Sequence, residues 1–350
     1  MERYKRQMQL SEVGKSGQQK LTSAKVLVIG AGGLGCAILP YLASSGIGNI
    51  GIMDGDTIGE SNLHRQILYS KKNLGQSKVK FAKKHLEHLN SDIKVHAFNH
   101  YLSGKNAIKI FNDYDIIVDA TDNLPTRYLI NDACIIANKP FVYGSVYKFE
   151  GQVAVFNYKN GPTYRCLFES NETEVPNCET SGVLGTTVGL IGMLQANETM
   201  KLILETGDML SGKLLIYNTL NNSQSCIEFA KNDKIRVDES FFSAVHLQTE
   251  IAEISLVKAL ENKLVFLDVR EYGELPKVDL PNTIQLPLSV IEKNISGMDK
   301  DTSYAVFCQS GKRSRQAVKL FKESEFKNVF NINGGVKSIK KNNINETSFC

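Results

Sequence analysis

The sequence predicts an α/β fold in two parts, a larger domain with a doubly wound sheet followed by a smaller α/β domain. Apolar strand-like runs alternate with helix-compatible segments, and a glycine-rich turn follows the first of these runs. The pattern weakens after residue 229, and a second alternation begins near residue 264. Because 350 residues suffice for two domains, we expect domains at residues 1–235 and 251–350, joined by a linker at 236–250.

The first strand and the turn after it predict a nucleotide site. Residues 26–29 are apolar and β-branched, and Gly30, Gly32 and Gly35 fit the pattern G-x-G-x-x-G, with Gly33 in the same turn. The three glycines permit the tight turn, a close backbone approach to phosphate, and close packing of helix on strand. The N-terminus of the next helix, expected over residues 37–45, would face the phosphates. This pattern predicts a Rossmann-like domain but not its chemistry.

Two later strands of the first domain end in polar residues. Residues 49–54 end in Asp54, about 20 residues beyond the last loop glycine, where a carboxylate binds a ribose. The apolar run 115–120 resembles a strand covered on both faces, and Asp122 and Asn123 follow it at the edge where ligands bind. The other expected elements are strands at 93–98, 140–145, 152–156 and 213–218, and helices at 76–90, 124–138 and 184–204. Polar residues 56–66 and irregular residues 163–180 indicate loops.

The second domain is predicted from strands at 264–270 and 303–307 and a helix at 315–321. Cys308 directly follows the second strand and begins a loop that leads to a helix N-terminus. Backbone N–H groups and the cations Lys312 and Arg313 would lower the pKa of this thiol. We therefore expect an accessible thiolate that can carry a sulfane sulfur as a persulfide.

Composition excludes several classes of function. The net charge of +4 is small and the lysines are scattered, so no nucleic-acid partner is expected. No apolar run reaches the ~18 residues of a membrane span. Residues 1–10 lack the apolar core of a signal peptide, so we expect a cytoplasmic protein without a membrane partner. The seven cysteines form no C-x-x-C pair, which argues against a disulfide scaffold.

The second domain resembles a rhodanese domain. The resemblance rests on Asp268-Val269-Arg270-Glu271, on Cys308-Gln309-Ser310-Gly311-Lys312-Arg313-Ser314, and on Asn333-Gly334-Gly335 as the closing turn. It implies a six-residue loop, residues 308–313, whose amides hold a persulfide on Cys308. The implied sulfur source is an upstream donor such as a cysteine desulfurase or thiosulfate.

The first domain resembles the MoeB/ThiF family, relatives of the ubiquitin-activating enzymes, and the fusion resembles the MoeZ type. The resemblance spans residues 3–229 and rests on segments that occur in the family's order: residues 3–7, the glycine loop, 54–56, 61–66, 75–79 and 121–123. It implies ATP and Mg²⁺ as cofactors and a homodimer in which Arg6 reaches the partner's nucleotide. The ATP-binding residues that it implies are Gly30, Gly32, Gly33, Gly35, Asp54, Asp56, Asn62, Arg65, Gln66, Lys78, Asp122 and Asn123, with Asp122 holding Mg²⁺.

The implied reaction is adenylation of the C-terminal Gly-Gly of a ubiquitin-like sulfur carrier of the MoaD or ThiS kind. Sulfur from Cys308 would then produce a thiocarboxylate. The implied catalytic residues are Arg65, Lys78, Asp122, Cys178 and Cys308. For Cys178 the implied role is a covalent link to the carrier, and the alternative is a free loop thiol. Molybdopterin synthesis is the first choice of pathway; thiamine thiazole synthesis and tRNA thiolation are alternatives.

One departure from the family concerns zinc. Most relatives hold Zn²⁺ with two C-x-x-C pairs, whereas here Cys166 is followed by Glu169 and no cysteine pair occurs after residue 229. Because a structural zinc usually needs four such ligands, we expect no zinc.

The residues alone are also compatible with two other functions. An NAD-dependent oxidoreductase would use the same glycine loop and Asp54 but has no need of Arg65, Lys78 or Asp122. A regulatory binding module with vestigial catalytic residues is a rival of another class. The retained charged residues and cysteines argue against it.

Overall fold

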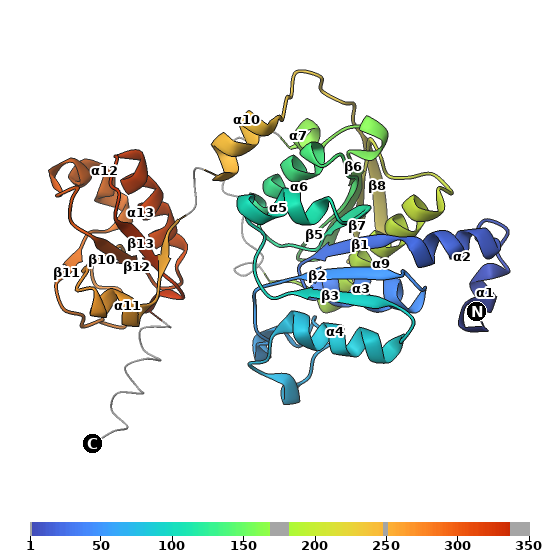
Figure 1. Cartoon of the computed structure of the whole chain (residues 1–350), viewed down its shortest axis with the longest axis horizontal. Coiled ribbons are helices and arrows are strands. Elements are labelled where there is room, and N and C mark those ends of the chain that lie inside the picture. Colours follow the sequence, from blue (N-terminus) through green and yellow to red (C-terminus); the bar gives the residue numbers. More distant parts are fainter. Residues whose placement is uncertain (1, 169–181, 248–250, 337–350) are drawn as a thin grey trace. The chain divides into compact units, whose positions relative to one another are not determined.

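The computed structural model describes residues 2–168, 182–247 and 251–336. The chain divides into two compact units, Met1–Leu247 and Gln248–Cys350. Each unit is built on its own sheet, and each is considered by itself (Figure 1). None of the described helices has the length and apolar character needed to cross a lipid bilayer.

The first unit contains an eight-stranded sheet in the order β3-β2-β1-β4-β5-β6-β7-β8. Its strands are β1 (Lys25–Ile29), β2 (Asn49–Met53), β3 (Lys94–Phe98), β4 (Ile116–Asp119), β5 (Phe141–Tyr147), β6 (Glu150–Phe156), β7 (Lys213–Asn218) and β8 (Ser223–Glu228). The first five strands pair in parallel, and β6, β7 and β8 continue the sheet as an antiparallel meander. The predicted doubly wound sheet is therefore confirmed.

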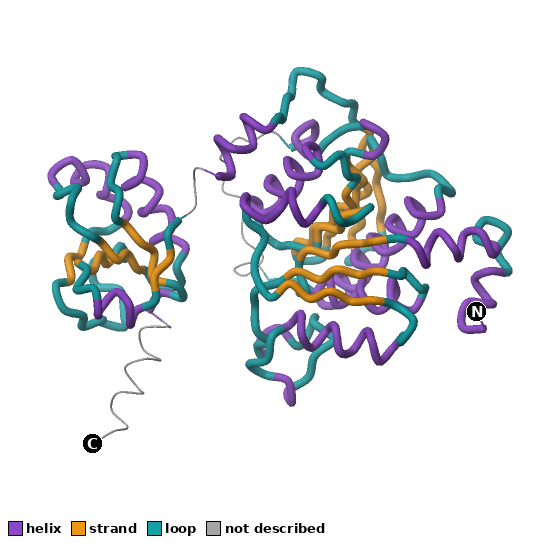
Figure 2. Tube along the Cα trace, in the orientation of Figure 1, coloured by secondary structure: helices purple, strands orange, loops and turns teal. Residues whose placement is uncertain are grey.

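Helices cover both faces of this sheet (Figure 2). One face carries α3 (Gly33–Ser44), α4 (Lys78–Leu89) and α9 (Gly185–Leu204), whose apolar residues form one core cluster with inward-facing residues of the strands. The other face carries α5 (Gly104–Phe111), α6 (Leu124–Ile136), α7 (Tyr164–Leu167) and α10 (Glu239–Phe242), which form a second cluster. Because the central strands β1, β2 and β4 are buried on both faces, their sequences are nearly continuous apolar runs.

Three elements of the first unit lack a clear signal in the sequence. The helix α2 (Gly14–Ser23) is mostly polar and buries few side chains. The helix α5 is short, and every residue of β8 is exposed, so no alternation of apolar and polar residues marks that edge strand. The basic arm before the first strand contains a short helix, α1 (Lys5–Met8).

The second unit has a five-stranded sheet in the order β11-β10-β12-β13-β9, in which all pairs are parallel. Its strands are β9 (Glu253–Ile254), β10 (Val265–Asp268), β11 (Thr283–Gln285), β12 (Tyr304–Phe307) and β13 (Val329–Ile332). Its helices include α11 (Leu256–Glu261), α12 (Ile291–Asn294) and α13 (Lys312–Glu323). Two core clusters, one containing residues of α13 and the other containing residues of α11, show that both faces of the sheet are covered.

The expected linker at 236–250 differs from the structure in its first part. Residues 239–247 form α10 and the π-helical turn Ser243–Leu247, and both belong to the first unit. Phe242 is 2% exposed within the second core cluster, and the Nε2 atom of His246 lies 2.7 Å from Oδ2 of the buried Asp132. Only one buried aromatic residue and one histidine anchor this segment, so its sequence lacks the repeated apolar residues that would indicate a packed helix.

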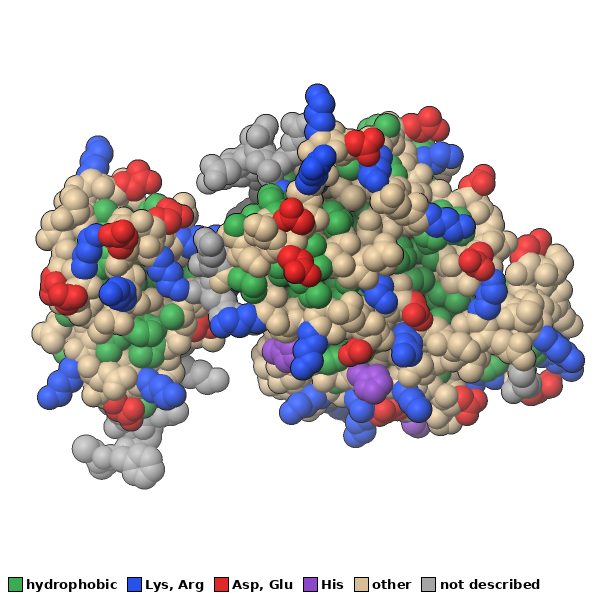
Figure 3. Space-filling view, turned by 45° about the horizontal axis from the view of Figure 1, so that its top comes forward, with side chains coloured by type: hydrophobic (Ala, Val, Ile, Leu, Met, Phe, Trp, Pro, Cys, Tyr) green, Lys and Arg blue, Asp and Glu red, His purple; other side chains and the backbone are tan. Residues whose placement is uncertain are grey.

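Charged side chains of both signs are interspersed on the drawn face of the first unit (Figure 3). This distribution agrees with the small net charge of +4. A face of this kind does not present the single-sign field typical of nucleic-acid binding.

Candidate active site

The glycine loop connects β1 to α3 and touches the turn that follows β4. Gly30 has φ +101°, and a Cβ there would lie 2.5 Å from the carbonyl oxygen of Ala120. A Cβ on Gly35 would lie 2.2 Å from the carbonyl oxygen of Gly30. Side chains are therefore excluded where the loop folds back on itself. Gly32 is the N-cap residue of α3, so the first N–H groups of that helix border the loop.

Asp54 lies at the carboxyl end of β2, beside the glycine loop. Its Oδ2 accepts the N–H of Ala31 at 2.8 Å, and its Oδ1 accepts the N–H of Asp56 at 2.8 Å. Burial raises the pKa of this carboxyl, while Lys78 and the two N–H groups oppose the change. Each carboxylate oxygen has a second lone pair, so Asp54 can accept a ribose hydroxyl while it holds the loop.

Polar side chains from the segment that precedes α4 lie beside the glycine loop. A Cβ on Gly33 would lie 3.4 Å from Cγ of Arg65, and a Cβ on Gly32 would lie 3.7 Å from Nε2 of Gln66. Arg65 Nη2 donates to Oδ1 of Asn62 at 2.8 Å. Gln66 is 4% exposed, and its Oε1 accepts no hydrogen bond from any described residue. The structure thus brings Asn62, Arg65 and Gln66 to the loop, as the sequence predicts.

Lys78 at the start of α4 is nearly buried, at 4% exposure, and its Nζ lies 2.9 Å from Oδ2 of Asp56. Burial alone would raise the pKa of Asp56, but hydrogen bonds from Tyr101 and Lys78 outweigh it and lower that pKa. The ammonium group is therefore held at the site by a carboxylate. A role of Lys78 toward phosphate stays a prediction, and it requires the ammonium to be shared with Asp56.

The end of β4 and the turn after it contain two carboxylates in different surroundings. Asp122, in the turn, is exposed. Asp119, the last residue of β4, is fully buried and pairs with Arg127 of α6. Asn123 serves as the N-cap of α6, since its Oδ1 accepts the N–H of Thr126 at 3.0 Å. The sequence analysis did not predict Asp119 or Arg127 as site residues. The signal that could have identified Asp119 is an acidic residue within an otherwise apolar strand.

Arg6 is exposed on α1. Tyr4, two residues earlier, is buried, and its hydroxyl accepts a hydrogen bond from Nδ2 of Asn90, in the segment that leads into β3. A Cβ on Gly46, which precedes β2, would lie 2.6 Å from the Tyr4 ring. The arm is thus attached at the amino ends of the strands, whereas the glycine loop lies at their carboxyl ends (Figure 1).

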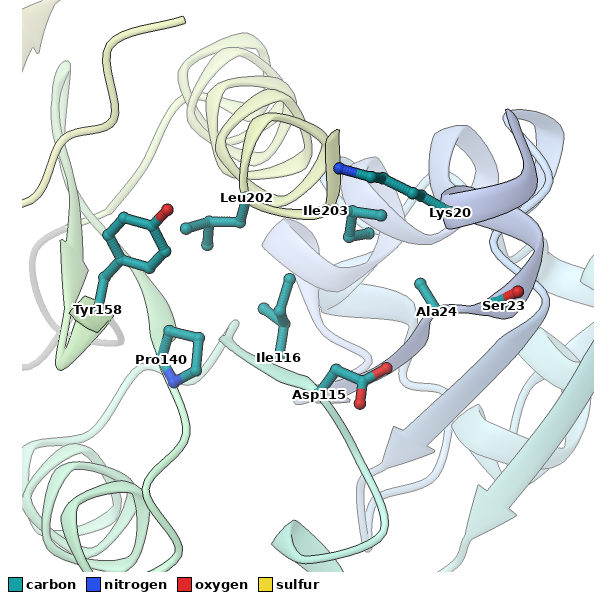
Figure 4. Close-up of a pocket in the computed structure, with 9 residues that line it drawn as sticks. All are labelled: Lys20, Ser23, Ala24, Asp115, Ile116, Pro140, Tyr158, Leu202 and Ile203. Carbon is teal, nitrogen blue, oxygen red and sulfur yellow. The ribbon is translucent and has the colours of Figure 1, made fainter. Parts of the chain in front are cut away.

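A pocket of about 350 Å³ also lies at the amino ends of the strands (Figure 4). Lys20, Asp115 and Tyr158 are among the residues that line it. Its position at the opposite edge of the sheet separates it from the glycine loop.

The cysteines of the first unit do not form a metal site among the described residues. Cys166 Sγ accepts the backbone N–H groups of Thr163 and Asn232, each at 3.4 Å. No group of three or more His, Cys, Asp or Glu side chains suited to a metal ion occurs in the described ranges. Glu169 and Cys178 lie outside them, so the role of Cys178 stays a prediction, as does the expectation of no zinc. Elemental analysis finding one tightly bound zinc per chain would contradict the latter.

The loop after β12 surrounds the thiol of Cys308. The Sγ atom accepts the N–H of Gly311 at 3.1 Å and lies 3.5 Å from Oγ of Ser314. Burial would raise the pKa of this thiol, but the hydrogen bonds from Ser314 and the backbone N–H groups of Ser310 and Gly311 outweigh it and lower that pKa. The expectation of a stabilised thiolate agrees with this direction.

The expectation of an accessible thiol is wrong for this conformation. Cys308 is only 1% exposed, because the loop wraps around the sulfur and the closing turn packs behind it. A Cβ on Gly335 would lie 2.2 Å from the Cys308 carbonyl oxygen, which shows how close that turn lies. The outer sulfur of a persulfide would extend about 2 Å beyond the Sγ atom. In this conformation the sulfur is therefore not presented to a donor in solution.

An ion pair closes one side of this loop. Arg313 pairs with Glu274, with Nη2 2.8 Å from Oε2. The hydrogen bonds from Arg313 lower the pKa of Glu274 to about 2. Asp268 and Arg270 form a second ion pair, which is buried, with Arg270 Nη2 2.6 Å from Oδ2 of Asp268. Glu274 and Ser314 were not predicted as site residues, although Ser314 follows the loop directly.

Comparison with known proteins shows the family of each part of the chain. The chain matches the ThiF family over residues 4–237 and the rhodanese-like domain over residues 254–342. It is 39% identical to the adenylyltransferase and sulfurtransferase MOCS3 of Culex quinquefasciatus, over 97% of this chain and 87% of that protein. It is 38% identical to a probable molybdopterin-synthase adenylyltransferase of Porphyra purpurea, over 96% of this chain and 92% of that protein.

Solved structures agree at the level of the fold. Escherichia coli MccB in complex with AMPCPP and selenomethionine MccA superposes with a TM-score of 0.60 at 24% identity, covering 67% of this chain and 73% of that chain. The complex of the same enzyme with ATP gives a TM-score of 0.58 at 21% identity, over 66% of this chain and 75% of that chain.

Proposed function

The chain belongs to the ThiF family and also contains a rhodanese-like domain, and from this premise we propose that it adenylates a sulfur-carrier protein and then transfers sulfur to it. The pathway proposed is molybdopterin biosynthesis, since the relatives with this domain plan include a molybdopterin-synthase adenylyltransferase. The observation that carries the proposal is that one chain contains both a charged glycine-loop site and a cysteine sulfur that accepts hydrogen bonds from its loop.

The residues at the glycine loop fit ATP with Mg²⁺. The loop leaves room only for hydrogen at Gly30 and Gly35, and the unsatisfied Oε1 of Gln66 requires a donor such as a ribose hydroxyl or water. Asp122 offers an exposed carboxylate, the hard oxygen ligand that Mg²⁺ prefers. When bound, Mg²⁺ would neutralise phosphate charge. Arg65 and Lys78 would add fixed positive charge that orients the triphosphate.

In the first step, a C-terminal carboxylate oxygen of the carrier attacks the α-phosphorus of ATP. The bond from the α-phosphorus to the bridging oxygen breaks, and pyrophosphate leaves with that oxygen. The N–H groups at the start of α3 and the side chain of Arg65, which both border the loop, would stabilise the charge that develops. An acyl-adenylate results.

In the second step, the terminal sulfur of the Cys308 persulfide attacks the acyl carbon, and AMP leaves. The product is an acyl disulfide between the carrier and Cys308. A thiolate then attacks the Cys308 sulfur, which releases the carrier as a thiocarboxylate and leaves a disulfide. Cys178 is the proposed attacking thiol, and a dithiol reductant would restore the pair.

The proposed assembly is a cytoplasmic homodimer that binds a ubiquitin-like carrier ending in Gly-Gly. Arg6 supports it, because α1 is attached at the amino ends of the strands and cannot serve its own glycine loop. The proposed sulfur source is a cysteine desulfurase or thiosulfate.

The test uses the purified full chain with ATP, Mg²⁺ and a Gly-Gly carrier. We expect carrier-dependent pyrophosphate exchange and, after a sulfur donor is added, a thiocarboxylate in the mass spectrum of the carrier. Binding of NADH in place of ATP would instead favour the oxidoreductase.

A further inference from the structure

The backbone of the turn after β4 is held from three directions by buried side chains. Asp119 Oδ1 accepts the N–H of Thr121 at 2.9 Å and its hydroxyl at 2.6 Å. Arg127 of α6 donates from Nη2 to the Thr121 carbonyl oxygen at 3.1 Å. Gln195 of α9 donates from Nε2 to the Asp119 carbonyl oxygen at 2.7 Å. Both peptide groups that flank Thr121 and the end of the strand are therefore fixed.

This arrangement leaves one buried carboxylate oxygen without a hydrogen bond from the described part of the chain and requires a glycine in the neighbouring strand. Asp119 is fully buried, and its Oδ2 accepts no hydrogen bond from any described residue, while Arg127 Nε lies 3.8 Å away. A Cβ on Gly144 would lie 2.2 Å from Cδ of Gln195, so the neighbouring strand omits a side chain where this amide passes. A buried and incompletely satisfied carboxylate destabilises a fold, and one at the edge of a binding site suggests a functional reason.

We propose that Asp119 and Arg127 are positioning residues for the adenylation reaction: they fix the Thr121 backbone and thereby aim the next residue, Asp122, at its ligand. The inference rests on the proposed function of the first unit. Asp122 itself is exposed, so its own surroundings give it little orientation. The same turn also contacts the glycine loop, since a Cβ on Gly30 would meet Ala120 and lie 3.4 Å from the Thr121 nitrogen. One rigid turn thus sets the distance between the loop and the carboxylate.

The test compares Asp119→Asn and Arg127→Met with the wild-type full chain. Asp119→Asn keeps an oxygen that can accept from Thr121 but removes the charge that pairs with Arg127. The first readout needs no activity: amide hydrogen exchange of residues 120–122 in the protein without nucleotide should become at least tenfold faster. The second is ATP affinity by calorimetry with and without Mg²⁺, where the Mg²⁺-dependent gain should shrink about tenfold or more. Arg127→Lys, which keeps the charge, should give intermediate values.

Asp132→Asn is the matched control. Asp132 is also fully buried and paired with an arginine, Arg165, but it lies away from the turn. We expect this variant to lose stability while exchange at 120–122 and the Mg²⁺ effect stay at wild-type values.

If Asp119→Asn fails to fold, Thr121→Val removes only the 2.6 Å bond to Asp119 and serves in its place. If Asp119→Asn behaves like Asp132→Asn, the positioning role is disproved and a structural role remains. If wild-type protein lacks pyrophosphate exchange, the proposed function fails, yet hydrogen exchange still tests the positioning of the turn.

Discussion

Two aspartates, one at the end of β4 and one in the turn after it, have different surroundings and therefore suit different roles. Asp119 is buried, and burial raises its pKa, opposed by Arg127 and Thr121. Asp122, three positions later, is exposed. A solvated carboxylate can exchange water for a metal ion at little cost, whereas a buried one is suited to holding the backbone. We therefore assign the ligand role to Asp122 and the positioning role to Asp119.

Replacing Asp122 tests the ligand role. Asp122→Ala should lower pyrophosphate exchange roughly 10²- to 10³-fold, as expected for loss of one electrostatic contact to the reacting group. Its melting temperature should remain at the wild-type value, because the side chain is exposed. Asp113→Ala, an exposed aspartate near the amino end of the same strand, is the control and should keep full activity. Normal turnover of Asp122→Ala would disprove the role.

Replacing Ser314 tests the origin of the low pKa at Cys308. The hydroxyl favours the thiolate, so its removal should raise the pKa and move the pH–rate profile of sulfur transfer about one pH unit toward alkaline. The rate at neutral pH should fall, because less of the thiol is ionised. Ser324→Ala, at the other end of α13, should leave the profile unchanged. An unchanged profile for Ser314→Ala would show that the backbone N–H groups alone lower the pKa.

At the scale of elements, the first unit ends in short segments that contain few apolar residues. The helix α10 has four residues and is anchored by Phe242 in the second core cluster. Asp132 binds His246 just beyond it and also binds Arg165, so three segments meet at one buried carboxylate. Burial alone would raise the pKa of this carboxylate, but the hydrogen bonds from Arg165 and then His246 together outweigh it and lower that pKa.

Phe242→Ala should destabilise the first unit by about 3 kcal/mol, the usual cost of removing a buried aromatic side chain. Calorimetry of the full chain should show the first unit unfolding several degrees earlier and the second unit unchanged. Leu247→Ala is the control: its side chain is 40% exposed and its loss should have little effect. Equal effects of the two substitutions would show that α10 does not anchor the segment.

At the scale of the whole molecule, each unit carries a distinct part of the chemistry. The first unit places its charged residues at the carboxyl ends of parallel strands, the usual ligand edge of such sheets. The second places the Cys308 sulfur at the same kind of edge, directly after β12. Arg6 lies at the opposite edge of the first sheet, which is the geometric basis for proposing that it acts on a second copy of the chain.

Mixed dimers test this proposal. Arg6→Ala and Asp122→Ala should each be inactive in adenylation, but mixed and re-equilibrated they should recover about a quarter of wild-type activity. Random pairing makes half of the dimers mixed, and each mixed dimer has one complete site when Arg6 acts across the interface. If Arg6 serves its own chain, mixing restores no activity.

The sequence by itself determined the α/β class, the glycine loop, the loop that begins at Cys308 and the positions of most strands along the chain. These features follow from local patterns: apolar runs for strands covered on both faces, and glycines where a Cβ would collide with backbone. Only the tertiary structure decided that Asp119, Arg127 and Glu274 belong to the sites, that residues 239–247 join the first unit, and that Cys308 is buried. Each of these depends on contacts between segments distant in the chain, and no local pattern encodes which distant side chain will fill a given space.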